Sequence, residues 1–214
     1  MAARAPERPG VSGVFVAFEG GEGVGKSTQI ARVAQWARAA GHEVLETREP
    51  GGTALGVELR ALVLDPVGQV TPRAEALIYA ADRAHHVETV IRPALAAGTL
   101  VLSDRYVDST LAYQGAGRGL GDGARAVTEW ATGGLVPDLT VLLDLDPAVG
   151  LARAVARSQP DRLESASVEF HRAVRERFLA LAAAEPQRYL VLDATLPEDD
   201  LGARIREAVA RLTG

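Results

Sequence analysis

Short apolar runs alternate along the chain with longer stretches of helical pattern. Five runs are rich in Val and Leu and too short for helices, and they are the predicted strands: VFVAF (14–18), EVLET (43–47), TLVLS (99–103), LTVLLDL (139–145) and YLVLD (189–193). Helices are predicted over residues 27–40, 56–64, 72–96, 122–132, 147–157, 167–184 and 198–212. This alternation is typical of a parallel sheet covered by helices. We therefore expect an α/β fold with one five-stranded parallel sheet and helices on both faces.

Two of the predicted helices have recognisable starts. Thr71 precedes Pro72 and Asp146 precedes Pro147, so each pair offers a capping side chain before a proline at the first helical position. The linkers are too short to separate domains, which predicts a single domain over residues 13–214. The first twelve residues, MAARAPERPGVS, mix Pro, Gly, Ala and charge, and we expect them to form a flexible tail.

The composition narrows the choice of partners and compartment. A chain of 214 residues that is 47% hydrophobic and 24% charged is long enough for a substantial core. Its 28 acidic and 23 basic residues give a net charge of −5, so no general attraction to nucleic acid or to an anionic membrane is expected. The absence of cysteine excludes disulfides, thiolate nucleophiles and Cys-ligated zinc. With no long apolar span, the sequence predicts a cytoplasmic protein.

A phosphate-binding loop follows the first predicted strand. Of the 23 basic residues only Lys26 is a lysine, and it lies in FEGGEGVGKSTQ (18–29). Gly20, Gly25, Lys26 and Ser27 have P-loop spacing, between a strand and a helix as the motif requires. Such a loop surrounds phosphates with backbone amides, adds the compact charge of the lysine, and brings the serine hydroxyl to Mg²⁺. The predicted ATP-binding residues are Gly20, Gly21, Glu22, Gly23, Val24, Gly25, Lys26, Ser27 and Thr28.

Because the chain has only one lysine, two other classes of nucleotide-binding protein are excluded. Protein kinases need a strand lysine outside any P-loop, and Ras-like GTPases recognise guanine through a loop that contains Asn-Lys. A P-loop NTPase-type enzyme that uses ATP and Mg²⁺ remains.

Further motifs lie where a second nucleotide would bind. TREPGG (47–52) places Arg48 at the end of the second predicted strand. Asp104 and Arg105 follow the third strand, at the edge where open α/β sheets bind ligands. Tyr79 and Arg83 are four residues apart on one helix face. The ordered combination of P-loop, REPGG, DRY (104–106) and AYQG (112–115) resembles the thymidylate kinase family, of the bacterial type with an arginine-bearing lid.

The resemblance implies phosphoryl transfer from MgATP to dTMP, which gives dTDP for dTTP synthesis, by a homodimeric kinase. It places Glu22 and Tyr113 beside the deoxyribose, and Tyr79, where most members have Phe, against thymine. Arg48 and Arg105 would bind phosphates, and Ser27 and Asp104 would serve Mg²⁺. The implied acceptor-binding residues are Arg48, Tyr79, Arg83, Arg105, Ser109, Thr110, Tyr113 and Gln114.

The implied lid spans about residues 153–165. Some members of the family carry an arginine inside the P-loop, at the place of Gly23, and here RAVARSQPDR (153–162) would supply the charge instead. The implied catalytic residues are Lys26, Arg105, Glu22, Arg153, Arg157 and Arg162. The Glu49–Pro50 bond is expected to be cis, because a tight turn must direct Arg48 into the site.

Several alternatives remain open from the residues themselves. Tyr79 could be a core aromatic, Arg83 a solvated helix residue, and the lid arginines an exposed helix face. Asp144 also ends an apolar strand and competes with Asp104 as the metal-supporting carboxylate. His85 and His86 have no pattern of metal ligands around them and are interpreted as structural. At the level of function, two alternatives remain: a kinase for another small acceptor, such as a different nucleoside monophosphate or shikimate, and an ATP-dependent switch or partner-activated ATPase.

Overall fold

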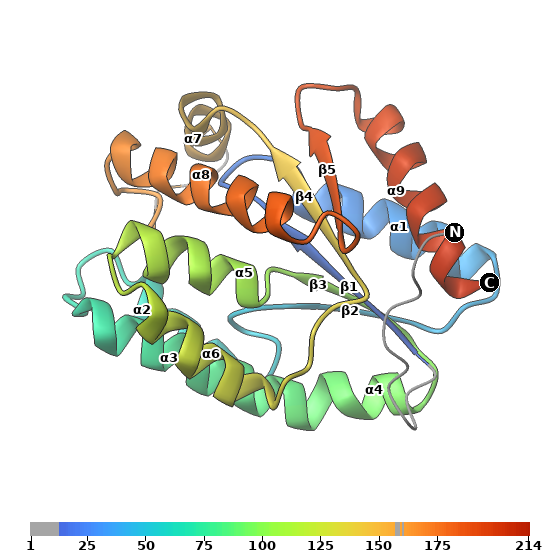
Figure 1. Ribbon diagram of the computed structural model, residues 1–214, viewed down its shortest axis with the longest axis horizontal. Helices are drawn as coiled ribbons and strands as arrows, with labels where there is room; N and C mark the ends of the chain where they lie inside the picture. The colour runs from blue at the N-terminus through green and yellow to red at the C-terminus, as the bar shows by residue number, and fades with distance from the viewer. Residues whose placement is uncertain (1–12, 157–158, 160) are drawn as a thin grey trace.

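The computed structural model describes residues 13–156, 159 and 161–214, so the predicted tail at 1–12 and the lid residue Arg157 lie outside the described residues. One five-stranded sheet has the order β2-β3-β1-β4-β5, and every pairing in it is parallel (Figure 1). The strands are β1 Val14–Glu19, β2 Val44–Arg48, β3 Leu100–Asp104, β4 Leu139–Asp144 and β5 Tyr189–Asp193. The predicted five-stranded P-loop NTPase-type α/β fold is confirmed.

Every predicted helix is present, and the structure adds one that was missed. The helices are α1 Lys26–Ala39, α2 Ala54–Leu64, α3 Pro72–His86, α4 Arg92–Ala96, α5 Val107–Thr110, α6 Asp122–Thr132, α7 Pro147–Val155, α8 Val168–Ala184 and α9 Glu198–Thr213, with π-helical segments η1 Val87–Ile91 and η2 Leu111–Gly117. The predicted helix 72–96 is continuous from α3 through η1 to α4. The helix formed by α5 and η2 was not predicted, because β-branched residues and glycines make 107–117 a weak helix former on its own. Packing against α8 and α6 supports it.

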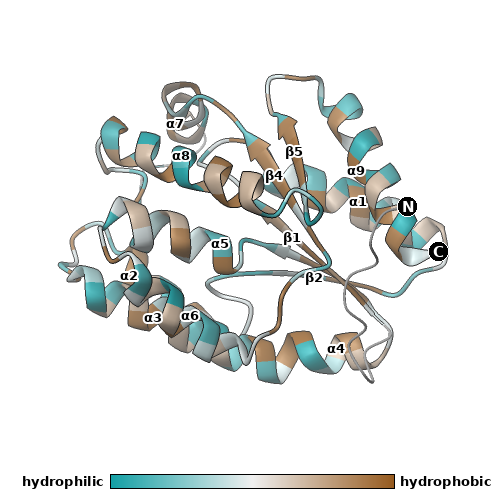
Figure 2. Ribbon diagram, viewed as in Figure 1, coloured by the Kyte–Doolittle hydropathy of each residue, from teal (hydrophilic) through white to brown (hydrophobic). Residues whose placement is uncertain are grey.

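Alternate side chains of β1 enter two separate cores. Val16 and Phe18 are buried with residues of α1 and α9 on one face of the sheet. Phe15 and Ala17 are buried with residues of η1 and α4 on the other. Because successive strand side chains point to opposite faces, a strand covered on both sides must be apolar throughout. The central strands β1 and β4 are accordingly hydrophobic along most of their length (Figure 2).

The carboxyl edge of the sheet gathers the predicted motifs. Asp104 of β3 lies in register with Phe18 of β1 and with Arg48 of β2. The P-loop, the REPGG turn and Arg105 therefore leave the same edge of three neighbouring strands. The Glu49–Pro50 bond is cis, as predicted. Among the described helices, none is long and apolar enough to cross a membrane.

Candidate active site

The P-loop is held against β4 and α7 by close backbone contact. Gly20 has φ 133°, and a Cβ there would collide with the carbonyl of Leu143. Gly23 has φ 64° and lies against the carbonyl of Gly150 in α7. Glycine is needed at both positions, because other residues adopt such φ values at a cost and have no room here.

Lys26 is folded into the loop that it belongs to. Its side chain is buried, and Nζ donates to the carbonyls of Gly20 at 3.2 Å and Gly21 at 2.8 Å. Burial and the positive charge of Arg105 lower the pKa of Lys26. The ammonium is thus a compact donor at the centre of a small ring of backbone groups. A guanidinium is wider and planar, and it does not have this geometry.

Ser27 and Asp104 meet at the start of α1. Ser27 Oγ donates to Asp104 Oδ2 at 3.1 Å. Asp104 Oδ1 is buried and has no hydrogen-bond partner among the described residues. The alternative carboxylate, Asp144, instead accepts two hydrogen bonds from Arg175, at 2.7 and 2.9 Å. Geometry therefore favours Asp104 as the carboxylate available to a cation.

The described residues contain no group of three or more His, Cys, Asp or Glu side chains that could hold a metal ion. One hydroxyl and one carboxylate are nevertheless a set that suits Mg²⁺, which usually keeps waters and is bound through a few protein oxygens together with phosphates. The side chains of Ser27 and Asp104 fit that group.

Arg105 connects the P-loop to the segment that follows β3. Its Nη1 donates to the carbonyl of Gly20 and to Ser109 Oγ, both at 3.1 Å, and its Nη2 donates to Glu22 at 2.8 Å. Its Cζ lies 5.0 Å from the centre of the Tyr113 ring. Four predicted site residues, Arg105, Ser109, Glu22 and Tyr113, are therefore in one cluster.

Glu22 is an ionised carboxylate beside the phosphate loop. Its Oε1 accepts from Arg105 and, at 2.7 Å, from the hydroxyl of Tyr113. Burial alone would raise the pKa of Glu22, but the charges of Arg105 and Lys26 outweigh it and lower that pKa to about 2. Glu22 and Tyr113, which were assigned to the same sugar from different motifs, are in direct contact.

Arg83 is buried and almost fully bonded, so the solvated alternative is wrong. It is 1% exposed and donates to Glu49 at 2.6 Å, to Thr110 Oγ1 at 2.8 Å and to the carbonyl of Tyr106 at 2.8 Å. His86 Nδ1 lies 2.9 Å from the other oxygen of Glu49. This agrees with a structural role for His86. Arg83 and Thr110, both among the predicted acceptor-binding residues, are neighbours, and their role in binding the acceptor stays a prediction.

Tyr79 belongs to an apolar cluster. It is 8% exposed and packs with Val63, Tyr113 and Phe178, and burial raises the pKa of its hydroxyl. Tyr79 is therefore packed as a core aromatic residue, which was the alternative to base stacking. Its predicted stacking on a base remains untested.

Sequence reasoning missed Arg60 of α2. Its Nη1 donates to the carbonyl of Pro50 at 3.0 Å, which ties α2 to the REPGG turn. Burial and the charges of Arg48 and Arg105 lower the pKa of Arg60. Three arginines thus converge on one region, an arrangement that favours an anion between them. The sequence did offer one indication of this role, because Arg60 is the only basic residue of α2, the helix that follows the REPGG turn.

The arginines assigned to the lid lie in different places. Arg153 of α7 lies beside Gly23 of the P-loop and donates to the carbonyl of Ala194 at 3.4 Å. Arg162 donates to the carbonyl of Val63 at 2.9 and 2.8 Å and pairs with Glu75 at 2.6 Å. Arg153 thus lies on the P-loop side, whereas Arg162 is docked against α2 and α3. Their catalytic roles stay predictions.

Glu75 is a second residue that the sequence did not reveal. It is fully buried, and besides Arg162 it binds Gln114 at 2.7 Å and Arg118 at 3.3 Å. The predicted acceptor residue Gln114 is therefore positioned by a buried carboxylate of α3.

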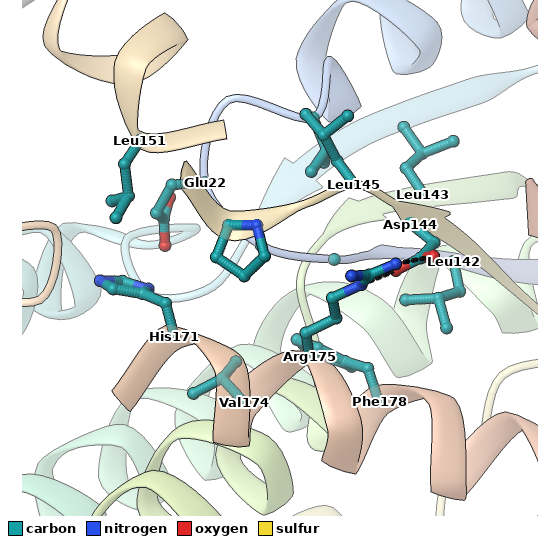
Figure 3. Close-up of a pocket in the computed structure, with 14 residues that line it drawn as sticks. Glu22, Leu142, Leu143, Asp144, Leu145, Leu151, His171, Val174, Arg175 and Phe178 are labelled. Carbon is teal, nitrogen blue, oxygen red and sulfur yellow. Dashed lines mark hydrogen bonds and ion pairs between the residues drawn. The ribbon is translucent and has the colours of Figure 1, made fainter. Parts of the chain in front are cut away.

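A small cavity lies between the P-loop, the end of β4 and α8 (Figure 3). Glu22 and His171 face each other across it, and the Asp144–Arg175 pair lies at its other end. Burial lowers the pKa of His171, and its Nε2 has no hydrogen-bond partner among the described residues. Sequence reasoning gave no role to His171.

Comparison with known proteins settles which family carries this site. Residues 18–205 match the family model described as thymidylate kinase. The chain belongs to the thymidylate kinase family. It is 59% identical over 198 residues to a thymidylate kinase of Clavibacter michiganensis subsp. michiganensis, covering 92% of this chain and 94% of that protein. It is 60% identical over 199 residues to a thymidylate kinase of Deinococcus radiodurans, covering 92% and 97%.

A less similar relative carries the same name. A thymidylate kinase of Gloeobacter violaceus is 50% identical over 199 residues, which cover 92% of this chain and 94% of that protein. Membership of the family makes the chain a nucleotide-binding phosphotransferase. The predicted resemblance and enzyme class are confirmed.

Proposed function

We propose that this protein transfers the γ-phosphoryl group of ATP to dTMP, giving dTDP and ADP, with Mg²⁺ as cofactor. The observation that carries the proposal is the position of Arg105, which touches the P-loop at Gly20 and also lies close enough to Arg48 and Arg60 to join their cluster. One cation thus stands between a phosphate-donor loop and an anion-binding region. Membership of the thymidylate kinase family identifies the acceptor class.

The donor phosphates lie over the P-loop. Backbone amides and Lys26 bind them, and Lys26 releases the carbonyls of Gly20 and Gly21 to do so. A hollow beside the loop, lined by Arg153, Ala194 and Leu196 among others, is open toward Gly23. It suits the base and ribose of ATP, because it adjoins the loop on the side away from Arg105.

Ser27 and Asp104 hold Mg²⁺ when it is bound with ATP. The cation neutralises charge on the phosphates. The support is the Ser27–Asp104 contact and the unpartnered Oδ1 of Asp104.

The acceptor lies on the other side of Arg105. Its phosphate binds among Arg48, Arg60 and Arg105, and its deoxyribose packs on Tyr113 and Glu22. Its thymine lies toward Tyr79 and Arg83. In this arrangement the acceptor oxygen attacks the γ-phosphorus directly, with no covalent enzyme intermediate, and the protein contributes positioning and positive charge. Arg153 and the 161–165 segment exclude water when both nucleotides are bound.

The test is a coupled assay of ADP release. The enzyme with MgATP is given dTMP, dUMP, dGMP, AMP, shikimate or no acceptor. We expect fast ADP release with dTMP and very little without an acceptor. A preference for another acceptor would assign a different kinase. Release that is independent of any acceptor would indicate an ATP-dependent switch or ATPase.

We also propose that the enzyme is a homodimer that associates through α2, α3 and α6. These helices lie side by side (Figure 1). They expose large apolar side chains: Leu62 is 56% exposed, Leu77 57% and Trp130 84%. Large apolar side chains left exposed on adjacent helices favour burial against a second protein surface. A second copy of the chain is the simplest such surface, because a two-fold axis pairs like patches.

Light scattering tests the dimer. Wild type is expected at twice the mass of one chain, and Leu77→Asp at the mass of one chain. The matched control is Leu212→Asp, which changes an exposed leucine of α9 on the opposite side of the sheet and should leave the dimer intact. A monomeric wild type would contradict the proposal.

A further inference from the structure

Glu19 ends β1 immediately before the first glycine of the P-loop, and nothing in its motif assigns it a role. Its side chain is fully buried. Burying a carboxylate is unfavourable unless donors surround it. The donors that bind Glu19 all come from the residues just after Arg105. Its Oε1 accepts from the backbone N–H of Tyr106 at 2.8 Å and of Ser109 at 3.1 Å, and its Oε2 accepts from Ser109 Oγ at 2.6 Å.

The hydroxyl of Ser109 joins Glu19 to Arg105. Arg105 Nη1 lies 3.1 Å from Ser109 Oγ. A guanidinium can only donate hydrogen bonds, so Ser109 Oγ accepts from Arg105 and gives its own hydrogen to Glu19. The hydrogen bonds therefore run in one direction, from Arg105 to Ser109 and from Ser109 to Glu19, and the Glu19 carboxylate is the final acceptor.

The backbone of Arg105 depends on the same carboxylate. Arg105 has φ 71°, a left-handed conformation that is uncommon for residues other than glycine and costs free energy unless the surroundings impose it. The next backbone N–H, that of Tyr106, is held by Glu19. Glu19 thus restrains Arg105 at its backbone and at its guanidinium.

We propose that Glu19 is a positioning residue for the reaction: by way of Ser109 and the Tyr106 amide it holds the guanidinium of Arg105 beside the P-loop. This proposal rests on the proposed function, in which Arg105 contacts the phosphates. Glu19 itself is buried beneath Arg105 and acts only through it.

The arrangement requires an ionised Glu19. Both of its oxygens are engaged as acceptors, so a proton on either one displaces an N–H or the Ser109 hydroxyl. Burial and the charge of Asp108 raise the pKa of Glu19 to about 7. The charged and titratable groups that face it come from several elements: Arg105 and Asp108 next to it, Lys26 from α1, Arg83 from α3 and Tyr189 from β5. Hence the positioning weakens as the pH falls below 7.

The first test compares wild type with Glu19→Gln and Ser109→Ala at pH 8, using kcat/KM for dTMP with saturating MgATP. A glutamine donates toward Ser109 Oγ instead of accepting from it. We expect about a tenfold loss or more in each variant, because both disorient one transition-state contact. The double variant should lose no more than either single one. Ser109→Ala keeps the carboxylate and its two backbone bonds, so it carries the test if Glu19→Gln does not fold.

The control is Asp138→Asn. Asp138 accepts from the backbone N–H of Phe15 at 2.8 Å, at the opposite end of β1. This isosteric change neutralises a carboxylate that supports the same strand away from the site, as Glu19→Gln does near it, and kcat/KM should stay near wild type. Equal losses in Asp138→Asn and Glu19→Gln would reduce Glu19 to a structural residue and overturn the proposal.

The second test follows pH. The ratio of kcat/KM between wild type and Glu19→Gln cancels the titration of the substrates, and it should fall from about tenfold at pH 8 to about twofold at pH 6. A flat ratio, or additive losses in the double variant, would contradict the proposal. The proposed function has its own test: it is wrong if wild type shows no ADP release that depends on dTMP. An active wild type matched by an equally active Glu19→Gln overturns only the positioning role.

Discussion

At the scale of single residues, the site is a set of paired charges around the P-loop. Lys26, Arg105 and Glu22 compensate one another, and the low pKa of Glu22 follows from its two cationic neighbours. Arg105 and Glu22 are therefore fixed in place before a nucleotide binds. Preorganised charge is the main contribution of a protein that transfers a phosphoryl group without forming a covalent enzyme intermediate.

Lys26→Arg should abolish activity without unfolding the protein. The charge is kept, but a planar guanidinium cannot occupy the position where Nζ bonds to Gly20 and Gly21. We expect kcat to fall by about 10²- to 10³-fold, the typical cost of one transition-state contact. The measurements are steady-state kinetics and thermal unfolding, with the exposed Arg38→Lys as control. Turnover near that of wild type would contradict this role of the lysine.

The pair Glu22 and Tyr113 should make the enzyme prefer a 2′-deoxy acceptor. A ring packed against C2′ leaves no partner for an added hydroxyl, so kcat/KM for ribothymidine monophosphate should be roughly tenfold to a hundredfold below that for dTMP. Tyr113→Ala should reduce the preference, whereas Tyr113→Phe, which keeps the ring, should retain it. Equal use of the two sugars by wild type would refute the assignment.

The sequence predicted part of this site and not the rest, for a physical reason. Glu22, Tyr113, Arg105 and Asp104 lie in short motifs whose chemistry is legible without coordinates. Glu75, Arg60 and His171 lie outside those motifs, and Glu19 precedes the P-loop glycines. The partners of Glu19 and Glu75 are distant in sequence. A carboxylate such as Glu75 becomes meaningful only when folding brings Gln114 and Arg162 to it.

At the scale of elements, strand and helix patterns were predictable because β1, β3, β4 and β5 are mostly apolar and the main helices have clear limits. The helix formed by α5 and η2 was not, since its stability comes from contacts with α6 and α8 rather than from its own residues. Its first residues carry the donors for Glu19. An element that the sequence specifies weakly thus contacts a residue to which we assign a positioning role.

The contact of α7 with the P-loop makes a prediction for a single glycine. A Cβ at Gly150 would collide with the carbonyl of Glu22. Gly150→Ala should displace the loop, destabilise the fold by about 1–3 kcal/mol and raise KM for ATP. Denaturant unfolding and steady-state kinetics measure both effects.

The matched control is Gly202→Ala in α9. A Cβ there meets only the ends of flexible side chains, of which the Arg206 guanidinium at 3.1 Å is the nearest. Alanine is the better helix former, so this variant should be neutral or slightly stabilised. If Gly150→Ala and Gly202→Ala show the same unfolding free energy and the same KM for ATP, the backbone contact between α7 and the P-loop is not needed to position the loop.

At the scale of the whole molecule, buried charge links stability to pH with two opposite signs. The pKa of Glu19 is raised from 4.5 to about 7, so the folded state binds more protons than the unfolded chain between these values. Its contribution is present below pH 4.5 and is lost as the pH rises through 7. The pKa of Glu22 is lowered from 4.5 to about 2, so its contribution is present above pH 4.5 and is lost as the pH falls through 2.

Urea unfolding of wild type and Glu19→Gln between pH 4.5 and 8 checks the first of these signs. The difference in unfolding free energy, wild type minus variant, should fall by about 3 kcal/mol as the pH rises and should level off above pH 7. A difference that increases with pH would show that Glu19 is stabilised, not destabilised, in its charged form.

At the proposed active site, a phosphate donor and a phosphate acceptor bind on the two sides of Arg105. The most direct test follows the products by ³¹P NMR after the enzyme is mixed with MgATP and dTMP. We predict one dTDP for each ADP, and essentially no ADP or free phosphate when dTMP is left out. Release of free phosphate in place of dTDP, or ADP formation that does not depend on dTMP, would contradict the account.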